Sequence, residues 1–168
     1  MNNPSTPSLS PAPGARDPRF AQIARALGYP LDAPLVVGGH YVPAVRHGGE
    51  VWVSGQVPRI GTTVAVTGRV GEATSLDEAR RAARICAVRT LHVLQQMLGS
   101  LDAVQRVLRV GVFVQSAPDF TQHSEVADAA SDLLFEVFGE MGTHARTAVG
   151  AYQLPKNASV ELELVAAA

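Results

Sequence analysis

The chain has 168 residues and a mass of 17.7 kDa, enough for one domain of ordinary size. Only 17% of its residues are charged, compared with about 25% in an average soluble domain. Its 14 basic and 15 acidic side chains give a formal net charge of −1. Proteins that hold nucleic acid by its phosphates, or a membrane surface by a polybasic segment, normally have a basic excess. We therefore expect neither nucleic acid nor a membrane as a partner.

The rest of the composition indicates where the protein works. Aromatic residues make up 5% of the chain, too few for a platform that stacks single-stranded bases. The single cysteine, Cys86, cannot form an intrachain disulfide, which favours the reducing cytoplasm. Residues 1–18 are rich in Pro, Ser, Asn and Ala and lack the segments of a secretory signal, so a disordered N-terminal tail is predicted.

Order is predicted to begin with a short helix. Asp17 is a suitable N-cap, Pro18 suits the first helical position, and Gly28 is a typical stop signal. The apolar residues between them recur at helical spacing, which predicts a helix at about residues 19–28. The sequence has no internal repeat, and residues 19–168 are expected to form a single domain.

Short strands and a long helix are predicted next. The strands are expected at residues 41–46, 50–54 and 64–67, with a hairpin signal, His47-Gly48-Gly49, between the first two. The helix is expected at 75–98, because Ser75 and Glu78 match a capping box and the apolar stripe that follows continues until Gly99. Cys86 lies in this stripe, where its expected role is that of a small buried hydrophobe.

The C-terminal half alternates strands with one more helix. Residues 107–115 form a continuous β-branched run, typical of a strand buried on both faces. A helix is predicted at 124–138, and two strands are predicted at 147–152 and 159–165. Because both of the longer helices fall between strands, we expect an α+β fold in which they cover one face of a mixed β-sheet.

Few signatures of enzyme chemistry are present. The sequence has no Gly-rich phosphate loop ending in Lys-Ser or Lys-Thr, and no Gly-x-Gly-x-x-Gly that opens a helix. His92 is expected on the exposed side of the long helix. The histidines are scattered without the spacing of a zinc site, so no metal is expected. They are His40, His47, His92, His123 and His144.

One arginine in the C-terminal third is a candidate for ligand binding. Arg146 follows a Gly-containing loop where a predicted strand begins, and the ends of elements often present functional side chains. Its planar guanidinium is suited to bidentate recognition of a carboxylate. A surface arginine or a structural salt bridge is the alternative, which spacing alone favours.

The last predicted strand has one apolar and one acidic face. Val160, Leu162 and Leu164 alternate with Glu161 and Glu163. On an amphipathic edge strand the two carboxylates would form a solvated pair. Alternatively, Glu161 points into a pocket, where burial would raise its pKa and suit it for proton transfer.

Several segments together resemble the Rid/YjgF family, the reactive intermediate deaminases, many of which are labelled endoribonuclease L-PSP. Val53-Ser54-Gly55-Gln56-Val57-Pro58 resembles the family's Ser-Gly-Gln-x-Pro segment, and Asp119-Phe120 resembles its Asp-Phe turn. The C-terminal signature is matched in order and spacing by Ala145-Arg146-Thr147-Ala148-Val149, Leu154-Pro155-Lys156 and Val160-Glu161-Leu162. The resemblance covers about residues 41–165 and is to a divergent RidA-like branch.

The resemblance implies a chorismate-mutase-like fold and a homotrimer with sites in clefts between subunits. It also implies an enamine/imine deaminase that hydrolyses 2-imino or 2-enamino acids to 2-keto acids and ammonia without a cofactor. Arg146 matches the arginine that binds the substrate carboxylate, and Glu161 matches the acidic residue near the attacking water. Tyr41 resembles the tyrosine of the family's Gly-Pro-Tyr-Ser motif and, with Ser54 and Gly55, is expected to bind substrate. The low charge content fits burial of part of the uncovered sheet face between subunits.

The sequence departs from the family pattern near the arginine. His144 replaces a proline or small residue, Ala148 stands where a cysteine is often found, and Ser124 and its neighbours replace an asparagine. A second hypothesis is therefore a non-catalytic trimer that binds a small carboxylate, such as a 2-keto acid, as a sensor or scavenger. A ribonuclease is disfavoured because the net charge is −1 and no catalytic histidine pair is apparent.

Overall fold

The order of helices and strands in the computed structural model follows the predicted one, with the addition of a two-residue strand at Arg59–Ile60. The structure describes residues 14–168, so residues 1–13 of the predicted tail lie outside the described residues. The helices are α1 (Arg16–Ala26), α2 (Leu76–Leu98) and α3 (His123–Phe138), with short 3-10 turns at Leu101–Ala103, Gly139–Gly142 and Pro155–Asn157. The strands are β1 (Ala44–His47), β2 (Glu50–Gln56), β3 (Arg59–Ile60), β4 (Thr63–Val64), β5 (Arg106–Gln115), β6 (Ala145–Ala151) and β7 (Val160–Ala167).

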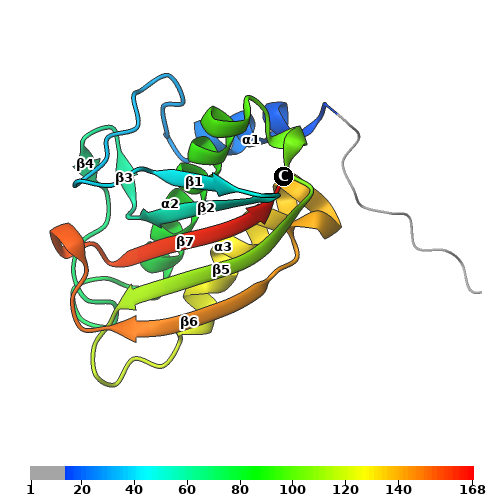
Figure 1. Cartoon of the computed structure of the whole chain (residues 1–168). Coiled ribbons are helices and arrows are strands. Elements are labelled where there is room, and N and C mark those ends of the chain that lie inside the picture. The colour runs from blue at the N-terminus through cyan, green and yellow to red at the C-terminus, as the bar shows by residue number, and fades with distance from the viewer. Residues whose placement is uncertain (1–13) are drawn as a thin grey trace, which may run out of the picture.

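Five of the strands form one sheet in the order β1-β2-β7-β5-β6, and β3 and β4 form a separate ribbon. Neighbours in the main sheet are antiparallel, except that β5 and β6 are parallel because the chain returns through α3 before it enters β6. Figure 1 shows α2 and α3 together on one side of this sheet. The predicted mixed sheet with two helices on one face is confirmed.

β7 is the central strand of the sheet, between β2 and β5. Val160, Leu162 and Leu164 are buried beneath the helices, and the alternating pattern places Glu161 and Glu163 on the uncovered face. The interpretation of this segment as an edge strand is therefore wrong, since the edges are β1 and β6. Both glutamates therefore belong to a strand that has a neighbouring strand on each side.

The capping box predicted for α2 is confirmed. The backbone N–H of Glu78 donates to Ser75 Oγ at 3.3 Å, and the backbone N–H of Ser75 donates to Glu78 Oε2 at 2.8 Å. Gly99 follows the helix with φ of 84°, a left-handed conformation that glycine adopts without strain. Cys86 is fully buried in the core, as expected, and burial raises the pKa of its thiol well above the usual range.

The start of α1 differs from the prediction. The helix begins at Arg16, and Asp17 lies in its first turn instead of capping it. The Asp17 carboxylate accepts hydrogen bonds from the backbone N–H of Leu101 and from Gln95 Nε2, both at 2.9 Å. The Asp17 carboxylate is thus hydrogen-bonded to groups distant in the sequence, and it does not cap its own helix.

Three further predictions are corrected by the structure. His92 is not on the exposed side of the helix: only 2% of its surface is exposed, and its Nδ1 is hydrogen-bonded to the Tyr29 hydroxyl at 3.1 Å. The strand predicted at 64–67 is shorter, since only Thr63–Val64 pairs with β3. The first strand begins at Ala44, so Tyr41 lies in the preceding loop.

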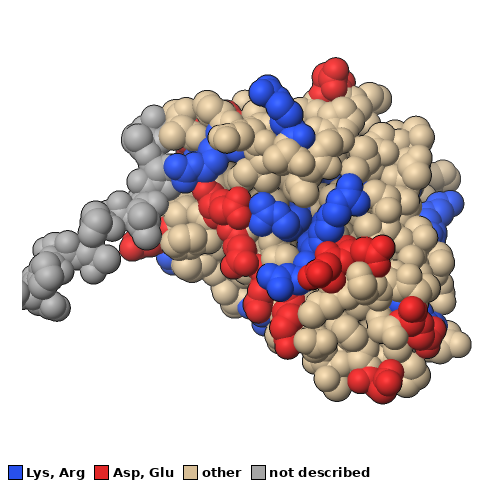
Figure 2. Space-filling view, turned by 180° about the vertical axis from the view of Figure 1, so that it is seen from behind, with Lys and Arg blue, Asp and Glu red and all other residues tan. Residues whose placement is uncertain are grey.

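The helix-covered face has a mixed charge. Figure 2 shows acidic and basic side chains interleaved across the middle of this face, with uncharged surface around them. Arg84 on α2 and Glu136 on α3 form an ion pair at 3.0 Å. Within residues 14–168, no helix combines the length and the apolar character needed to cross a bilayer.

Candidate functional site

A cavity of about 190 Å³ lies beside the end of β2. Its wall combines residues of the 35–43 segment, the end of β2 and start of β3, the middle of α2, and the start of β7. The register between β2 and β7 shifts after Val53, and such irregularities bend a strand. Segments that are far apart in the sequence therefore meet around one hollow.

Glu161 reaches into this cavity across Gly55. A Cβ atom at position 55 would collide with the Glu161 carboxylate, so only glycine leaves room for it against the β2 backbone. Glu163 has the same relation to Gly111 on β5, but it lines a different hollow beside Trp52. Glycines on the two strands flanking β7 thus make room for both carboxylates.

The environment of Glu161 favours its protonated form. Burial raises the pKa of Glu161 above the usual range of a glutamate, and the negative charge of Glu163 raises it further. No basic side chain within residues 14–168 forms an ion pair with Glu161. The pKa of Glu161 is therefore raised in the direction that favours general acid–base catalysis near neutral pH.

The raised pKa of Glu161 predicts a pH-dependent effect on stability. The folded protein binds the Glu161 proton more tightly than the unfolded chain, so stability is lost as pH rises from the unfolded pKa of about 4.3. Glu161→Gln removes this loss and should raise the free energy of unfolding at pH 7, with the gain disappearing near pH 4. Urea denaturation between pH 4 and 8 measures it.

A second variant provides the control. Glu163→Gln removes the charge that helps to raise the pKa of Glu161, so it should reduce the pH dependence without abolishing it. A stability difference between wild type and Glu161→Gln that does not change with pH would contradict the assignment.

Of the other residues predicted to bind substrate, Tyr41 and Gly55 line the cavity and Ser54 does not. Tyr41 lines the cavity, with about half of its side chain exposed. Ser54 lies outside the cavity wall, and its hydroxyl donates to the Val42 carbonyl at 2.8 Å. The fold therefore brings Tyr41 and Gly55 together with Glu161, whereas Ser54 lies outside this group.

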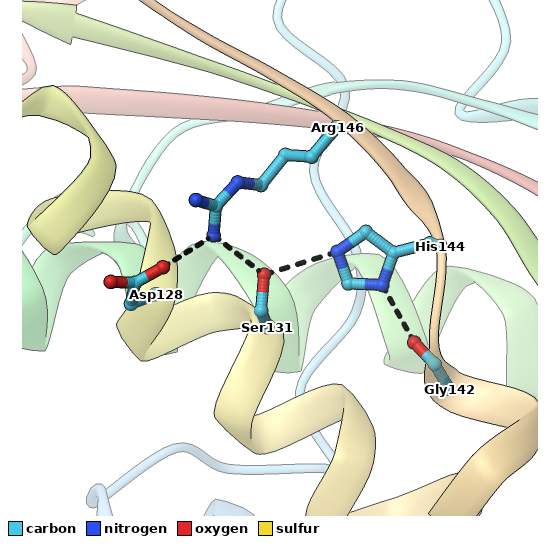
Figure 3. A network of polar contacts seen from close by, with 5 residues as sticks. All are labelled: Asp128, Ser131, Gly142, His144 and Arg146. Carbon is cyan, nitrogen blue, oxygen red and sulfur yellow. Dashed lines mark hydrogen bonds and ion pairs between the residues drawn. The ribbon is translucent and has the colours of Figure 1, made fainter.

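Arg146 lies in another hollow, beside α3 at the outer edge of the sheet (Figure 3). Its Nη1 donates to Asp128 Oδ1 at 2.8 Å and to Ser131 Oγ at 2.9 Å. Its Nε and Nη2 make no hydrogen bond to any residue within 14–168. The guanidinium is thus held along one side, and its other edge remains available for a ligand.

His144 completes the support of this arginine. Its Nδ1–H donates to the Gly142 carbonyl at 2.6 Å, so its Nε2 accepts from the Ser131 hydroxyl at 3.0 Å. Burial lowers the pKa of His144, and the charge of Arg146 also lowers it, which favours the neutral ring. As Figure 3 shows, Ser131 connects the ring to the guanidinium.

Within one chain, Arg146 and Glu161 lie apart. Arg146 faces α3 from the edge strand β6, whereas Glu161 lies on the uncovered face of the central strand β7. The two line separate hollows. Within residues 14–168, no three His, Cys, Asp or Glu side chains are grouped as a metal ion would require.

Comparison with known proteins identifies the family. The family model described as Endoribonuclease L-PSP matches residues 32–168. The chain belongs to the Rid/YjgF family. The architecture of this Rid/YjgF protein, a mixed sheet with helices on one face, agrees with that assignment.

Relatives of this Rid/YjgF chain carry different descriptions. Protein TCP17 of Trypanosoma cruzi is 43% identical over 146 residues, which cover 86% of this chain and 91% of that protein. A 2-iminobutanoate/2-iminopropanoate deaminase of Dermatophagoides farinae is 31% identical over 142 residues, covering 84% and 94%. The crystal structure of Atu1372 from Agrobacterium tumefaciens, of unknown function, has a TM-score of 0.81 at 38% identity, covering 92% and 94%.

Two arginines of this Rid/YjgF protein that were not predicted as site residues, Arg59 and Arg89, line the same cavity as Glu161. Arg89 follows Cys86 by three residues and so shares the buried face of α2, which is an unusual place for a charge. That position could have indicated a functional role for Arg89, whereas nothing in the sequence around Arg59 indicates that it lines a cavity.

Proposed function

We propose that the protein is an enamine/imine deaminase that hydrolyses 2-imino or 2-enamino acids to 2-keto acids and ammonia. The observation that carries the proposal is Glu161, a carboxyl group with raised pKa that lies over Gly55 inside a cavity. The deaminase relative from Dermatophagoides farinae gives further support, because it is similar along most of its length.

The proposed reaction needs one acid–base group and one water molecule. Water adds to C2 of the imine, the nitrogen takes up protons, and the C2–N bond breaks to release ammonia and the keto acid. Glu161 positions the water and accepts its proton, and the protonated carboxyl then supplies a proton to the leaving nitrogen. Holding the imine beside a positioned water removes part of the entropic barrier. No cofactor takes part.

Binding of the substrate carboxylate is assigned to Arg146. The Nε–Nη2 edge of a guanidinium matches a carboxylate in a bidentate geometry, and this edge has no partner within residues 14–168. Since Arg146 and Glu161 line separate hollows of one protomer, the proposed site combines Glu161 of one copy with Arg146 of a neighbouring copy.

A homotrimer supplies that neighbour in our proposal. The uncovered sheet face exposes Trp52 and Val45 on paired strands and Val149 on β6, each with at least 40% of its surface accessible. Exposed apolar side chains of this size favour contact with another copy. Sedimentation equilibrium should give three times the chain mass of 17.7 kDa, and a monomer would contradict the shared site.

The activity is tested with imines generated in place by an amino-acid oxidase. The purified protein should accelerate release of ammonia and keto acid above the rate in buffer. Absence of acceleration across several amino acids, with a folded oligomer confirmed, would refute the deaminase.

A second candidate is the non-catalytic carboxylate binder. It is favoured by the Asp128–Arg146 ion pair, which a ligand carboxylate must share or displace. Calorimetry would then detect keto-acid binding that is lost in Arg146→Ala, while no imine is turned over.

Gly55 provides a steric test of the site. Gly55→Ala should reduce imine hydrolysis strongly, because the added Cβ displaces the Glu161 carboxylate. Gly111→Ala is the matched control, since its Cβ displaces only Glu163. Steady-state kinetics of the two variants measures the difference, and equal activities would show that the position of the Glu161 carboxylate does not matter.

A further inference from the structure

The cavity that holds Glu161 also has a strongly cationic wall. Arg89 is 5% exposed, and its Nε donates to Gln56 Oε1 at 3.3 Å. Arg59 lines the same cavity, and its Nε is buried without a hydrogen-bond partner among residues 14–168. Lys156 adds a third basic side chain to the lining.

These charges are not neutralised by the described part of the chain. Burial lowers the pKa of Arg89, and the positive charge of Arg59 contributes to lowering it, so the two guanidinium groups are close enough to repel. Neither forms an ion pair with a carboxylate within residues 14–168. The one acid that lines the cavity, Glu161, has a raised pKa, so these arginines do not hold it in its charged form.

A buried guanidinium (Arg89) beside a partly buried one (Arg59), with no anionic partner for either among residues 14–168, is costly because burial removes water from the charged groups. A ligand with a negative group beside them would offset that cost. The rest of the wall is largely apolar, with Leu35, Val57 and Val93 among its residues. Apolar walls lower the polarity around the guanidinium groups, which strengthens any ion pair formed there.

We propose that Arg59 and Arg89 bind a second carboxylate of the ligand, so that the substrate class is the 2-imino dicarboxylic acids. The inference rests on the proposed function, in which Arg146 of a neighbouring copy binds the first carboxylate and C2 lies beside Glu161. A monocarboxylate would leave the buried Arg89 and the buried Nε of Arg59 without an anionic partner, and unpaired buried polar groups are a strong source of discrimination.

Calorimetry with two stable 2-keto acids of equal chain length tests this directly. The intact protein should bind 2-oxoglutarate about tenfold or more tightly than 2-oxopentanoate, the gain expected from one additional charge-assisted contact. Arg59→Met and Arg89→Met should each remove this preference. Arg81→Met is the control, because Arg81 is exposed on the same helix as Arg89 and its loss changes the net charge equally.

The outcomes separate this inference from the proposed function. Equal affinity for the two keto acids, or a preference that survives in Arg59→Met, overturns the dicarboxylate site even if imines are hydrolysed. A preference lost in Arg59→Met but kept in Arg81→Met supports it, even if no imine is turned over. Arg59 is only partly buried, so its variant decides the question if Arg89→Met fails to fold.

Discussion

Replacing Glu161 with glutamine should lower the rate of imine hydrolysis by about 100-fold or more, the usual contribution of a positioned acid–base group. The amide keeps the shape of the side chain in the space over Gly55, but it can neither accept the proton of water nor return one to nitrogen. Ammonia release from imines generated in place measures the loss, and binding of keto acids should be much less affected.

The neighbouring carboxylate provides the control. Glu163→Gln changes the same residue type two positions along β7, outside the cavity. It should keep most of the activity and move the pH profile toward lower pH, because the pKa of Glu161 falls when the nearby charge is removed. Similar activities of the two glutamine variants would mean that Glu161 is not the acid–base group.

Arg146→Met should weaken binding of a 2-keto acid roughly 10- to 150-fold, the range expected for losing a charge-assisted carboxylate contact. The loss should appear mainly in KM and in the calorimetric Kd, since the arginine holds the substrate carboxylate and does not move protons. Titration of wild type and variant with the same keto acid measures it.

Arg84→Met is the matched control for that experiment. Arg84 is partly buried and is ion-paired to a carboxylate on α3, as Arg146 is, but its partner is Glu136. Removing Arg84 should leave keto-acid affinity unchanged. Unchanged affinity in Arg146→Met would assign the arginine to the alternative foreseen from its sequence spacing, a structural ion pair.

Much of the fold was predictable from the sequence because the signals are local. The capping box at Ser75 and Glu78 depends on residues three apart, and the alternation of Val160 and Leu162 with Glu161 depends on the pleat of one strand. The segments that resemble the Rid/YjgF family are likewise contiguous, and the family assignment is confirmed. Asp17 and His92 were misplaced because their partners lie elsewhere in the chain.

Sequence alone therefore indicated most of the elements, the family, and Arg146 and Glu161 as candidate catalytic residues. Tertiary structure decided that these two line separate hollows of a single chain, and that Arg59 and Arg89 share the cavity with Glu161. The physical reason is that a cavity forms where distant segments meet, here where β2 loses register and the middle of α2 packs beside it. Periodicity reports which face of an element is apolar, but it carries no information about which other element covers that face.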